Sequence, residues 1–387
     1  MSSSSDTLTL TASCLCGTHN YSTTFPTSVL PLPGHTCHCT TCRHLTGSLH
    51  TSLTAWPEPH ANVDLSGLKA FTAWERFDLL FCPTCSSPMF CAFRDPARNL
   101  AVITGALGNV DVGDRQLIKF GGMGFVLDTE DGGASPWICA LNGDGMNSKS
   151  YEGMPPGRSP APKELPPDWP RCSTLPELQT KEEDSVPIRC KCGGVDLLLR
   201  RGDYINVSEE DLPSCVVPAS RKLKASFCAC NSCRLQSGTD IFYWAFAETK
   251  YLSFGKDASK AFPTDIFELS NLIDAKDPVI GTLKYYKSSP DVHRYFCETC
   301  SAVIFYSVSD RRQIVDIAVG VLESKDGARI ENMLSWPFGK TMSGQEDGNG
   351  GWRESLYERV RGKADEWRAT RGYPRNWTNR EEYETIE

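Results

Sequence analysis

"CHCTTCR", residues 37–43 of the chain, places the thiols of Cys37, Cys39 and Cys42 within six positions. A disulfide explains this cluster poorly, because three thiols cannot pair without a leftover and Cys-X-Cys is too short for easy disulfide geometry. A metal ion explains it better, because thiolates at this spacing can wrap one ion. The stretch therefore predicts a metal site, and the spacing of the other cysteines can be compared with it.

The composition of the whole chain describes an ordinary globular protein. It has 387 residues, enough for about two domains, with 40% hydrophobic residues and a net charge of −8. This charge gives no bias towards nucleic acid or an anionic membrane, so we expect neither as a partner. The N-terminal segment MSSSSDTLTLTAS lacks the basic and apolar regions of a signal peptide, and no apolar run is long enough to cross a bilayer. We expect a cytoplasmic protein, where 18 cysteines are metal ligands rather than disulfides.

The clustered cysteines occur in two matching sets. The first set is Cys14-X-Cys16, Cys37-X-Cys39-X-X-Cys42 and Cys82-X-X-Cys85, and the second is Cys190-X-Cys192, Cys228-X-Cys230-X-X-Cys233 and Cys297-X-X-Cys300. Flanking residues repeat as well: CLCG matches CKCG, CRHLTG matches CRLQSG, and FCPTCS matches FCETCS. An internal duplication is the simplest cause. The sequence therefore predicts two copies of one domain, and the two repeats are expected to be able to pair with each other within the chain.

The segments between the clusters predict the domain boundaries. We expect a first zinc domain at 8–150, a proline-rich linker at 151–186, a second zinc domain at 187–352, and a C-terminal helix and tail at 353–387. The second copy is longer than the first, with an insertion within 252–280.

The secondary structure expected in each copy is mainly β. Short runs such as VDLLL, IFYWAF and VIFYSV are rich in β-branched and aromatic residues and are bounded by Gly, Pro and Asp. Helical periodicity appears at 353–371, where Leu356, Val360, Ala364 and Trp367 fall on one face. We expect this helix to pack on the second domain.

Seven clustered cysteines per copy make one closed four-thiol site and one open three-thiol site. Thiolates that share a zinc with bonds of about 2.3 Å lie within roughly 4 Å of each other, so CxCxxC can wrap one ion locally and CxC needs the distant CxxC. The closed sites are then Cys14, Cys16, Cys82, Cys85 and Cys190, Cys192, Cys297, Cys300; the open sites are Cys37, Cys39, Cys42 and Cys228, Cys230, Cys233. We expect about four zinc ions per chain, with an iron–sulfur cluster and disulfides as the alternatives.

The order CxCG, CxCxxCRxx(T/S)G and FCxxC resembles the glutathione-dependent formaldehyde-activating family, also called the CENP-V/GFA domain, here in tandem. The resemblance covers most of both copies. It implies two zinc-binding β-tent domains, the same zinc grouping, and carbon–sulfur lyase chemistry on glutathione adducts, with glutathione as a possible co-substrate. The chain departs from the pattern at Ser86 and Ser301, where the family has glycine after the last CxxC. This departure leaves zinc binding in place and the identity of the substrate open.

The chemistry expected of an open three-thiolate zinc agrees with this family. Three thiolates give the unit a formal charge of −1 and weaken the zinc as a Lewis acid, so it favours a soft fourth ligand such as a substrate thiolate or a thiohemiacetal oxygen. We predict a zinc-dependent carbon–sulfur lyase that acts on a small molecule, with the catalytic positions held by the six cysteines of the open sites. The alternatives are a zinc enzyme redeployed for elimination, isomerisation or ring formation, and a non-catalytic interaction module whose zincs are all structural.

Other residues near the clusters have candidate roles. Arg43 and Arg234 directly follow the open clusters and are candidates to bind the substrate or glutathione, with a structural salt bridge as the alternative. His38 could supply a fourth ligand in the first copy, but its counterpart is Ala229, so we expect a solvent-facing role for it instead. Arg294, just before the second CxxC, favours the second copy as the active one, since the first copy reads DLLFCPTC there. The default interpretation of the remaining cysteines is buried or incidental free thiols: Cys91, Cys139, Cys172 and Cys215.

Overall fold

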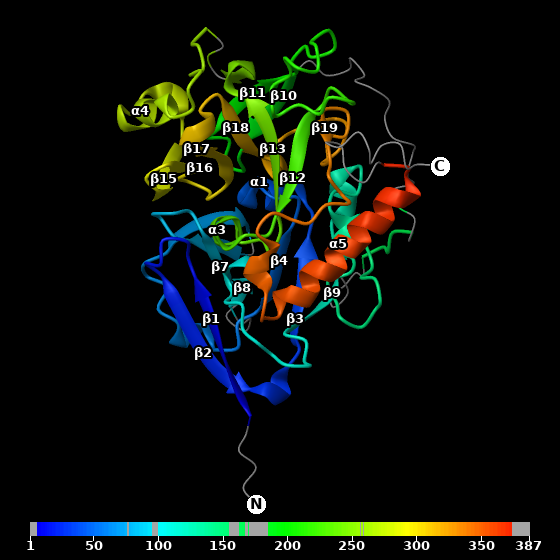
Figure 1. The fold of residues 1–387 in the computed structure, drawn as a ribbon. Coiled ribbons are helices and arrows are strands. Elements are labelled where there is room, and N and C mark those ends of the chain that lie inside the picture. Colours follow the sequence, from blue (N-terminus) through cyan, green and yellow to red (C-terminus); the bar gives the residue numbers. More distant parts are fainter. Residues whose placement is uncertain are drawn as a thin grey trace, which may run out of the picture.

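The computed structural model describes residues 6–75, 77–94, 100–154, 162–166, 169, 185–255, 257 and 259–373. The chain is mainly β, as predicted, and each copy contributes one seven-stranded sheet. Figure 1 shows the first copy, in blue and cyan, below the second copy, in green to orange. Among the described residues, no helix is both long and apolar enough to cross a membrane.

The sheet of the first copy has the strand order β5-β6-β7-β8-β4-β3-β9, with the hairpin β1-β2 as a separate sheet. Strands β3 and β9 are parallel. The elements are β1 (Thr7–Ser13), β2 (Asn20–Pro26), β3 (Leu32–Cys37), α1 (Thr40–Thr46), β4 (Thr51–Ala55), β5 (Lys69–Trp74), β6 (Phe77–Phe81), β7 (Pro88–Phe93), β8 (Ala101–Ile103), β9 (Ile118–Gly124) and α2 (Ser135–Ile138).

The sheet of the second copy has the matching order β15-β16-β17-β18-β13-β12-β19. The predicted insertion adds β14 and α4, and β14 joins the hairpin β10-β11 in a three-stranded sheet. The elements are β10 (Ser185–Arg189), β11 (Asp196–Arg200), β12 (Leu223–Cys228), α3 (Asn231–Ser237), β13 (Phe242–Glu248), β14 (Leu252–Phe254), α4 (Glu268–Asp274), β15 (Leu283–Ser289), β16 (Val292–Cys297), β17 (Val303–Val308), β18 (Ile314–Ala318), β19 (Leu334–Ser335) and α5 (Arg353–Thr370).

The register of the strands is the same in the two copies. Leu79 lies opposite Cys91 between β6 and β7, and Arg294 lies opposite Tyr306 between β16 and β17. Both members of each pair occupy repeat-related positions, 215 residues apart. Residues of one copy can therefore be compared directly with their counterparts in the other.

The two copies contact each other through reciprocal backbone hydrogen bonds. Gly47 and Gly238 end α1 and α3 in the left-handed conformation, with φ of 78° and 74°. The amide of Gly105 donates to the carbonyl of Gly238 at 2.9 Å, and the amide of Gly320 donates to that of Gly47 at 2.8 Å. A Cβ at Gly105 would lie 2.1 Å from the carbonyl carbon of Gly238, so this approach of the two backbones requires glycine. The arrangement is that of a two-fold dimer built from one chain.

The C-terminal helix α5 lies where the sequence predicts a helix, but it packs against both copies rather than the second alone (Figure 1). Arg353 pairs with Asp240 of the second copy at 2.8 Å and donates to the carbonyl of Thr104 of the first copy at 2.6 Å. Trp352 donates through its ring nitrogen to the carbonyl of Gly108 of the first copy at 3.1 Å. The helix therefore joins the copies. Most of the predicted linker, 151–186, lies outside the described residues.

Candidate metal centres

Four groups of cysteines gather within the described residues, and in each group the Sγ atoms all lie within 4.8 Å of one another. The four-thiol groups are Cys14, Cys16, Cys82, Cys85 and Cys190, Cys192, Cys297, Cys300; the three-thiol groups are Cys37, Cys39, Cys42 and Cys228, Cys230, Cys233. These are the groups expected from the spacing of the cysteines. The first-copy and second-copy groups of each kind are called here the first and second closed centres and the first and second open centres.

The closed centres fit zinc. The Sγ atoms of Cys14 and Cys16 are 3.5 Å apart, and those of Cys16 and Cys82 are 3.6 Å apart. A tetrahedral zinc with bonds of about 2.3 Å places its sulfur ligands about 3.8 Å apart. Cys14 and Cys16 lie between β1 and β2, whereas Cys82 follows β6, so an ion here would tie the separate hairpin to the main sheet. That position indicates a structural role.

Serine takes the place of glycine after each CxxC without changing the turn. Ser86 and Ser301 have φ of 63° and 70°, in the left-handed region that glycine usually supplies. The amide of Ser86 donates to the carbonyl of Cys82 at 3.0 Å, and the amide of Ser301 donates to that of Cys297 at 3.0 Å. The metal-binding turn therefore keeps its shape despite the departure from the family pattern.

Each open centre is built at the junction of a strand and a short helix. Cys37 ends β3, Cys39 caps α1, and Cys42 lies in the first turn of that helix. The Sγ atoms of Cys37 and Cys39 are 3.5 Å apart, and the amide of Cys42 donates to the Sγ of Cys39 at 3.3 Å. Hydrogen bonds from the thiols of Cys37 and Cys42 lower the pKa of Cys39, which favours its thiolate. The second open centre repeats this arrangement around Cys230.

Each open centre offers three thiols to a metal ion. Among the described residues, no histidine or carboxylate atom joins either group within 4.8 Å. His38 is therefore not placed as a fourth ligand of the first open centre. The prediction that it faces solvent is also wrong, because its ring is buried and stacks on His50 with the ring centroids 5.7 Å apart. Three thiolates with a free fourth position are the ligand set of a zinc ion that can bind a further ligand.

The second open centre has charged and polar neighbours. The Nη1 atom of Arg294 is 3.9 Å from the Sγ of Cys233 and 3.1 Å from the Oε1 of Gln236. The guanidinium carbon of Arg294 is 4.9 Å from the centroid of the Tyr306 ring. Asp316 lies opposite Tyr306 on the neighbouring strand β18 and pairs with Arg311 through both terminal nitrogens of the guanidinium. Burial raises the pKa of Asp316 to about 6.

The first open centre has apolar residues at the same register positions. Leu79 replaces Arg294, Cys91 replaces Tyr306, and Ala101 replaces Asp316. On the helix that carries the last ligand, Leu45 stands where the second copy has Gln236. The two open centres therefore share their ligands but not their surroundings. Sequence reasoning missed the role of Gln236, Tyr306 and Asp316, which a comparison of the two copies position by position would have detected.

Arg43 and Arg234 are both buried and make contacts within the protein. Arg43 donates to the Oγ1 of Thr40 at 3.2 Å and to the carbonyl of Asp128 at 3.2 Å. Arg234 donates to the carbonyl of Leu107, in the other copy, at 2.8 Å. These contacts favour the structural alternative, and a role in substrate binding stays a prediction. Cys91, Cys139 and Cys215 are buried free thiols, while Cys172 lies outside the described residues.

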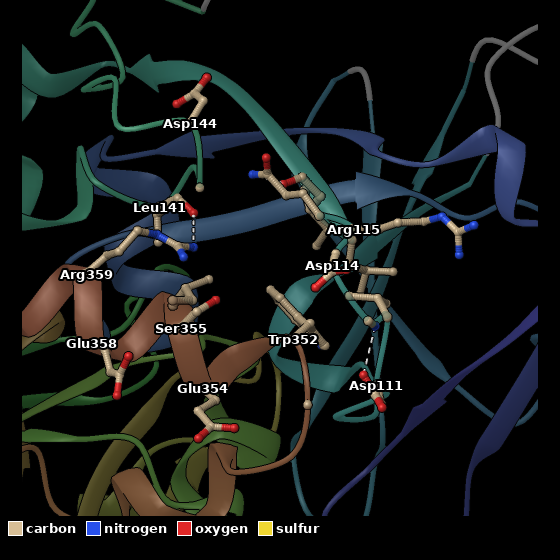
Figure 2. Close-up of a pocket in the computed structure, with 18 of the residues that line it drawn as sticks. Asp111, Asp114, Arg115, Leu141, Asp144, Trp352, Glu354, Ser355, Glu358 and Arg359 are labelled. Carbon is tan, nitrogen blue, oxygen red and sulfur yellow. Dashed lines mark hydrogen bonds between the residues drawn. The ribbon is translucent and has the colours of Figure 1, made fainter.

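Several hollows lie among the described residues, and one of about 610 Å³, lined by Thr40, Arg43 and Asp128, borders the helix that carries Cys42. Another, of about 710 Å³, lies between the loop after β8 and the first half of α5; the charged side chains that line it, shown in Figure 2, are mostly acidic, and no cysteine is among its lining residues. A third, of about 270 Å³, runs along β12 and is lined by Ser226 and Ser343, among others. It begins next to the second open centre, because Ser343 pairs with Cys228.

Comparison with known proteins found one family. A family model described as "Glutathione-dependent formaldehyde-activating enzyme" matches residues 9–118 and 216–335. The two matched regions fall in the two copies and together cover more than half of the chain. No curated protein and no solved structure matches the chain.

Proposed function

Because this chain belongs to the family of glutathione-dependent formaldehyde-activating enzymes, we propose that it is a zinc-dependent carbon–sulfur lyase that makes or breaks the carbon–sulfur bond of a small glutathione adduct. The observation that carries the proposal is a three-thiol centre with a buried guanidinium beside it, at Cys228, Cys230, Cys233 and Arg294. When bound there, zinc supplies a Lewis-acid position that suits a soft sulfur or oxygen anion.

The charges around the second open centre suit the reaction. Cleavage of a thiohemiacetal transfers the hydroxyl proton to solvent, converts the C–O bond to a carbonyl, and leaves the electron pair of the broken C–S bond on sulfur. The guanidinium of Arg294, next to Cys233, can stabilise this thiolate through a charge-assisted hydrogen bond. Its burial increases the effect, because the same charge acts more strongly when water is excluded.

Gln236 and Arg294 can also orient the adduct. The Oε1 of Gln236 accepts a hydrogen bond from Arg294, while its buried Nε2 has no partner among the described residues. A buried donor without a partner costs about 1–3 kcal/mol, so a ligand that accepts from it would gain that stabilisation. We assign this amide to the oxygen or the carboxylate of the substrate.

The experiment is an exchange measurement on the zinc-loaded full-length protein with glutathione and formaldehyde. Nuclear magnetic resonance gives the rate at which formaldehyde moves between its free form and the glutathione adduct. We expect the protein to accelerate this exchange and Arg294→Met to lower the acceleration by about 10–100-fold, in line with the loss of one charge-stabilising donor. An exchange rate equal to that without protein contradicts the proposal and leaves the two alternatives, a zinc enzyme redeployed for elimination, isomerisation or ring formation and a non-catalytic interaction module.

A further inference from the structure

The two open centres differ in their exposure to solvent. All three thiols of the first open centre are buried, with Cys39 only 1% exposed. Its counterpart Cys230, in the second open centre, is partly exposed. Among the described residues, the second open centre therefore exposes one thiol to solvent that is covered in the first.

The residue that produces this difference lies at one matched position. Cys37 pairs in parallel with Gly124, and Cys228 pairs in parallel with Ser343. The residues that follow these partners are Phe125 and Gly344, which are therefore equivalent. Both precede a 3₁₀ turn and both have the left-handed conformation, with φ of 55° and 69°.

Phe125 covers the first open centre. Its partly buried side chain packs against the cluster formed by these three cysteines, and its ring contacts Trp74 with the centroids 6.1 Å apart. A bulky residue rarely adopts a positive φ, and this conformation costs about 1–2 kcal/mol. A glycine at this position would avoid the strain of the positive φ. We therefore expect the packing of the phenylalanine side chain over the cysteines to offset that strain.

Glycine at 344 keeps the second open centre uncovered. A Cβ at this position would lie 2.3 Å from the Cβ of Cys230. No other residue fits there without movement of the backbone, so no side chain can cover the ion from this position. The same turn is therefore a cover in the first copy and an opening in the second.

The two open centres also differ in the side chains at two matched positions beside them. Arg294 and the unpaired amide of Gln236 adjoin the second open centre, whereas Leu79 and Leu45 hold these positions in the first. The charged neighbour of the first open centre is Arg43, which donates to Thr40 and to the carbonyl of Asp128 within the protein. A structural ion needs neither access from solvent nor a partner for a substrate anion.

We infer that the two open centres have divided their roles: the second takes an anionic thiol or its adduct, held by Arg294 and Gln236, while Phe125 seals the first as a structural metal site. The nature of the substrate rests on the proposed function. The difference in access does not, because it follows from Phe125 and Gly344 alone.

The test measures access directly on the folded, zinc-loaded full chain. Brief treatment with iodoacetamide, followed by cysteine-resolved mass spectrometry, gives a labelling rate for each thiol. We expect Cys230 to react at least tenfold faster than Cys39 in the wild type. In Phe125→Gly we expect Cys39 to react at least tenfold faster than before, with the rate of Cys230 unchanged.

Equal rates for Cys39 and Cys230 in the wild type, or no increase at Cys39 in a folded Phe125→Gly variant, would overturn the inference. Phe125→Leu is the second variant in case glycine unfolds the turn: it keeps an apolar side chain but shortens it, and we expect an intermediate labelling rate. A protein that shows the difference in labelling but no glutathione-adduct exchange contradicts the proposed function while leaving the difference in access intact.

Discussion

Gly344→Ala is the change that most sharply tests the geometry of the second open centre. The new Cβ would lie 2.3 Å from the Cβ of Cys230, whereas non-bonded carbon atoms are at their best separation at about 3.5–4.0 Å. The backbone of residue 344 or of Cys230 must then move by about 1 Å. Since Cys230 also caps α3 through its Sγ, such a movement disturbs the ligand and the helix together.

Gly350→Ala is the matched control. Gly350 has a φ of 70°, close to the 69° of Gly344, but a Cβ there would meet no atom within 4 Å. Both variants lose about 1–2 kcal/mol because alanine is strained at this φ. Only Gly344→Ala adds steric overlap, which costs about 1–3 kcal/mol more.

Thermal unfolding and zinc content measured on the same preparations separate the two variants. We expect Gly344→Ala to melt several degrees below Gly350→Ala, since about 1 kcal/mol corresponds to roughly 2–4 °C in domains of this size. We also expect Gly344→Ala to lose about one zinc ion and most of the adduct exchange. Equal melting temperatures and equal zinc contents in the two variants would refute the assignment of Gly344 as the opening of the centre.

Three further predictions concern the zinc content, the first closed centre and a buried histidine. Elemental analysis of purified protein should give about four zinc ions per chain, since each copy has one closed and one open centre; about two ions, or mainly iron, would contradict the grouping. Cys85→Ala should lower the melting temperature clearly more than Cys91→Ala, because only Cys85 belongs to a centre that ties the first hairpin to the sheet; equal effects would remove the structural role. Burial lowers the pKa of His50 from 6.5 to about 4. Because the folded pKa lies below the unfolded one, the neutral ring stabilises the fold above pH 6.5 and loses about 3 kcal/mol as the pH falls towards 4. Denaturation at a series of pH values should therefore show less acid destabilisation in His50→Gln than in the wild type, and identical pH profiles would contradict the shift.

The grouping of the cysteines was predictable because thiolates that share one ion must lie close together, which restricts their spacing in the sequence. CxCxxC brings its three thiols together locally, and a CxC that lacks local partners must find a distant CxxC, as Cys14 and Cys16 find Cys82 and Cys85. The duplication was predictable for the same reason, since the spacing occurs twice. The mainly β fold also followed from the short runs of β-branched and aromatic residues.

The surroundings of the open centres were not predictable, because they depend on strand register. Tyr306 and Asp316 lie beside Arg294 only because β16, β17 and β18 pair in one particular alignment. Phe125 reaches the first open centre because β9 runs parallel to β3, although 88 residues separate it from Cys37 in the sequence. The position of α5 across both copies likewise depends on how the copies pack together, and its helical periodicity carries no information about that packing.

The matched variants Cys233→Ala and Cys42→Ala test whether the carbon–sulfur chemistry proposed here takes place at the second open centre. Each change removes the last ligand of one open centre and leaves the other centre intact. The measurement is the rate of glutathione–formaldehyde adduct exchange by each folded, zinc-loaded variant. We expect Cys233→Ala to abolish the acceleration and Cys42→Ala to keep it. Full acceleration in Cys233→Ala with the second open zinc shown to be gone, or loss of acceleration in Cys42→Ala alone, would contradict this expectation.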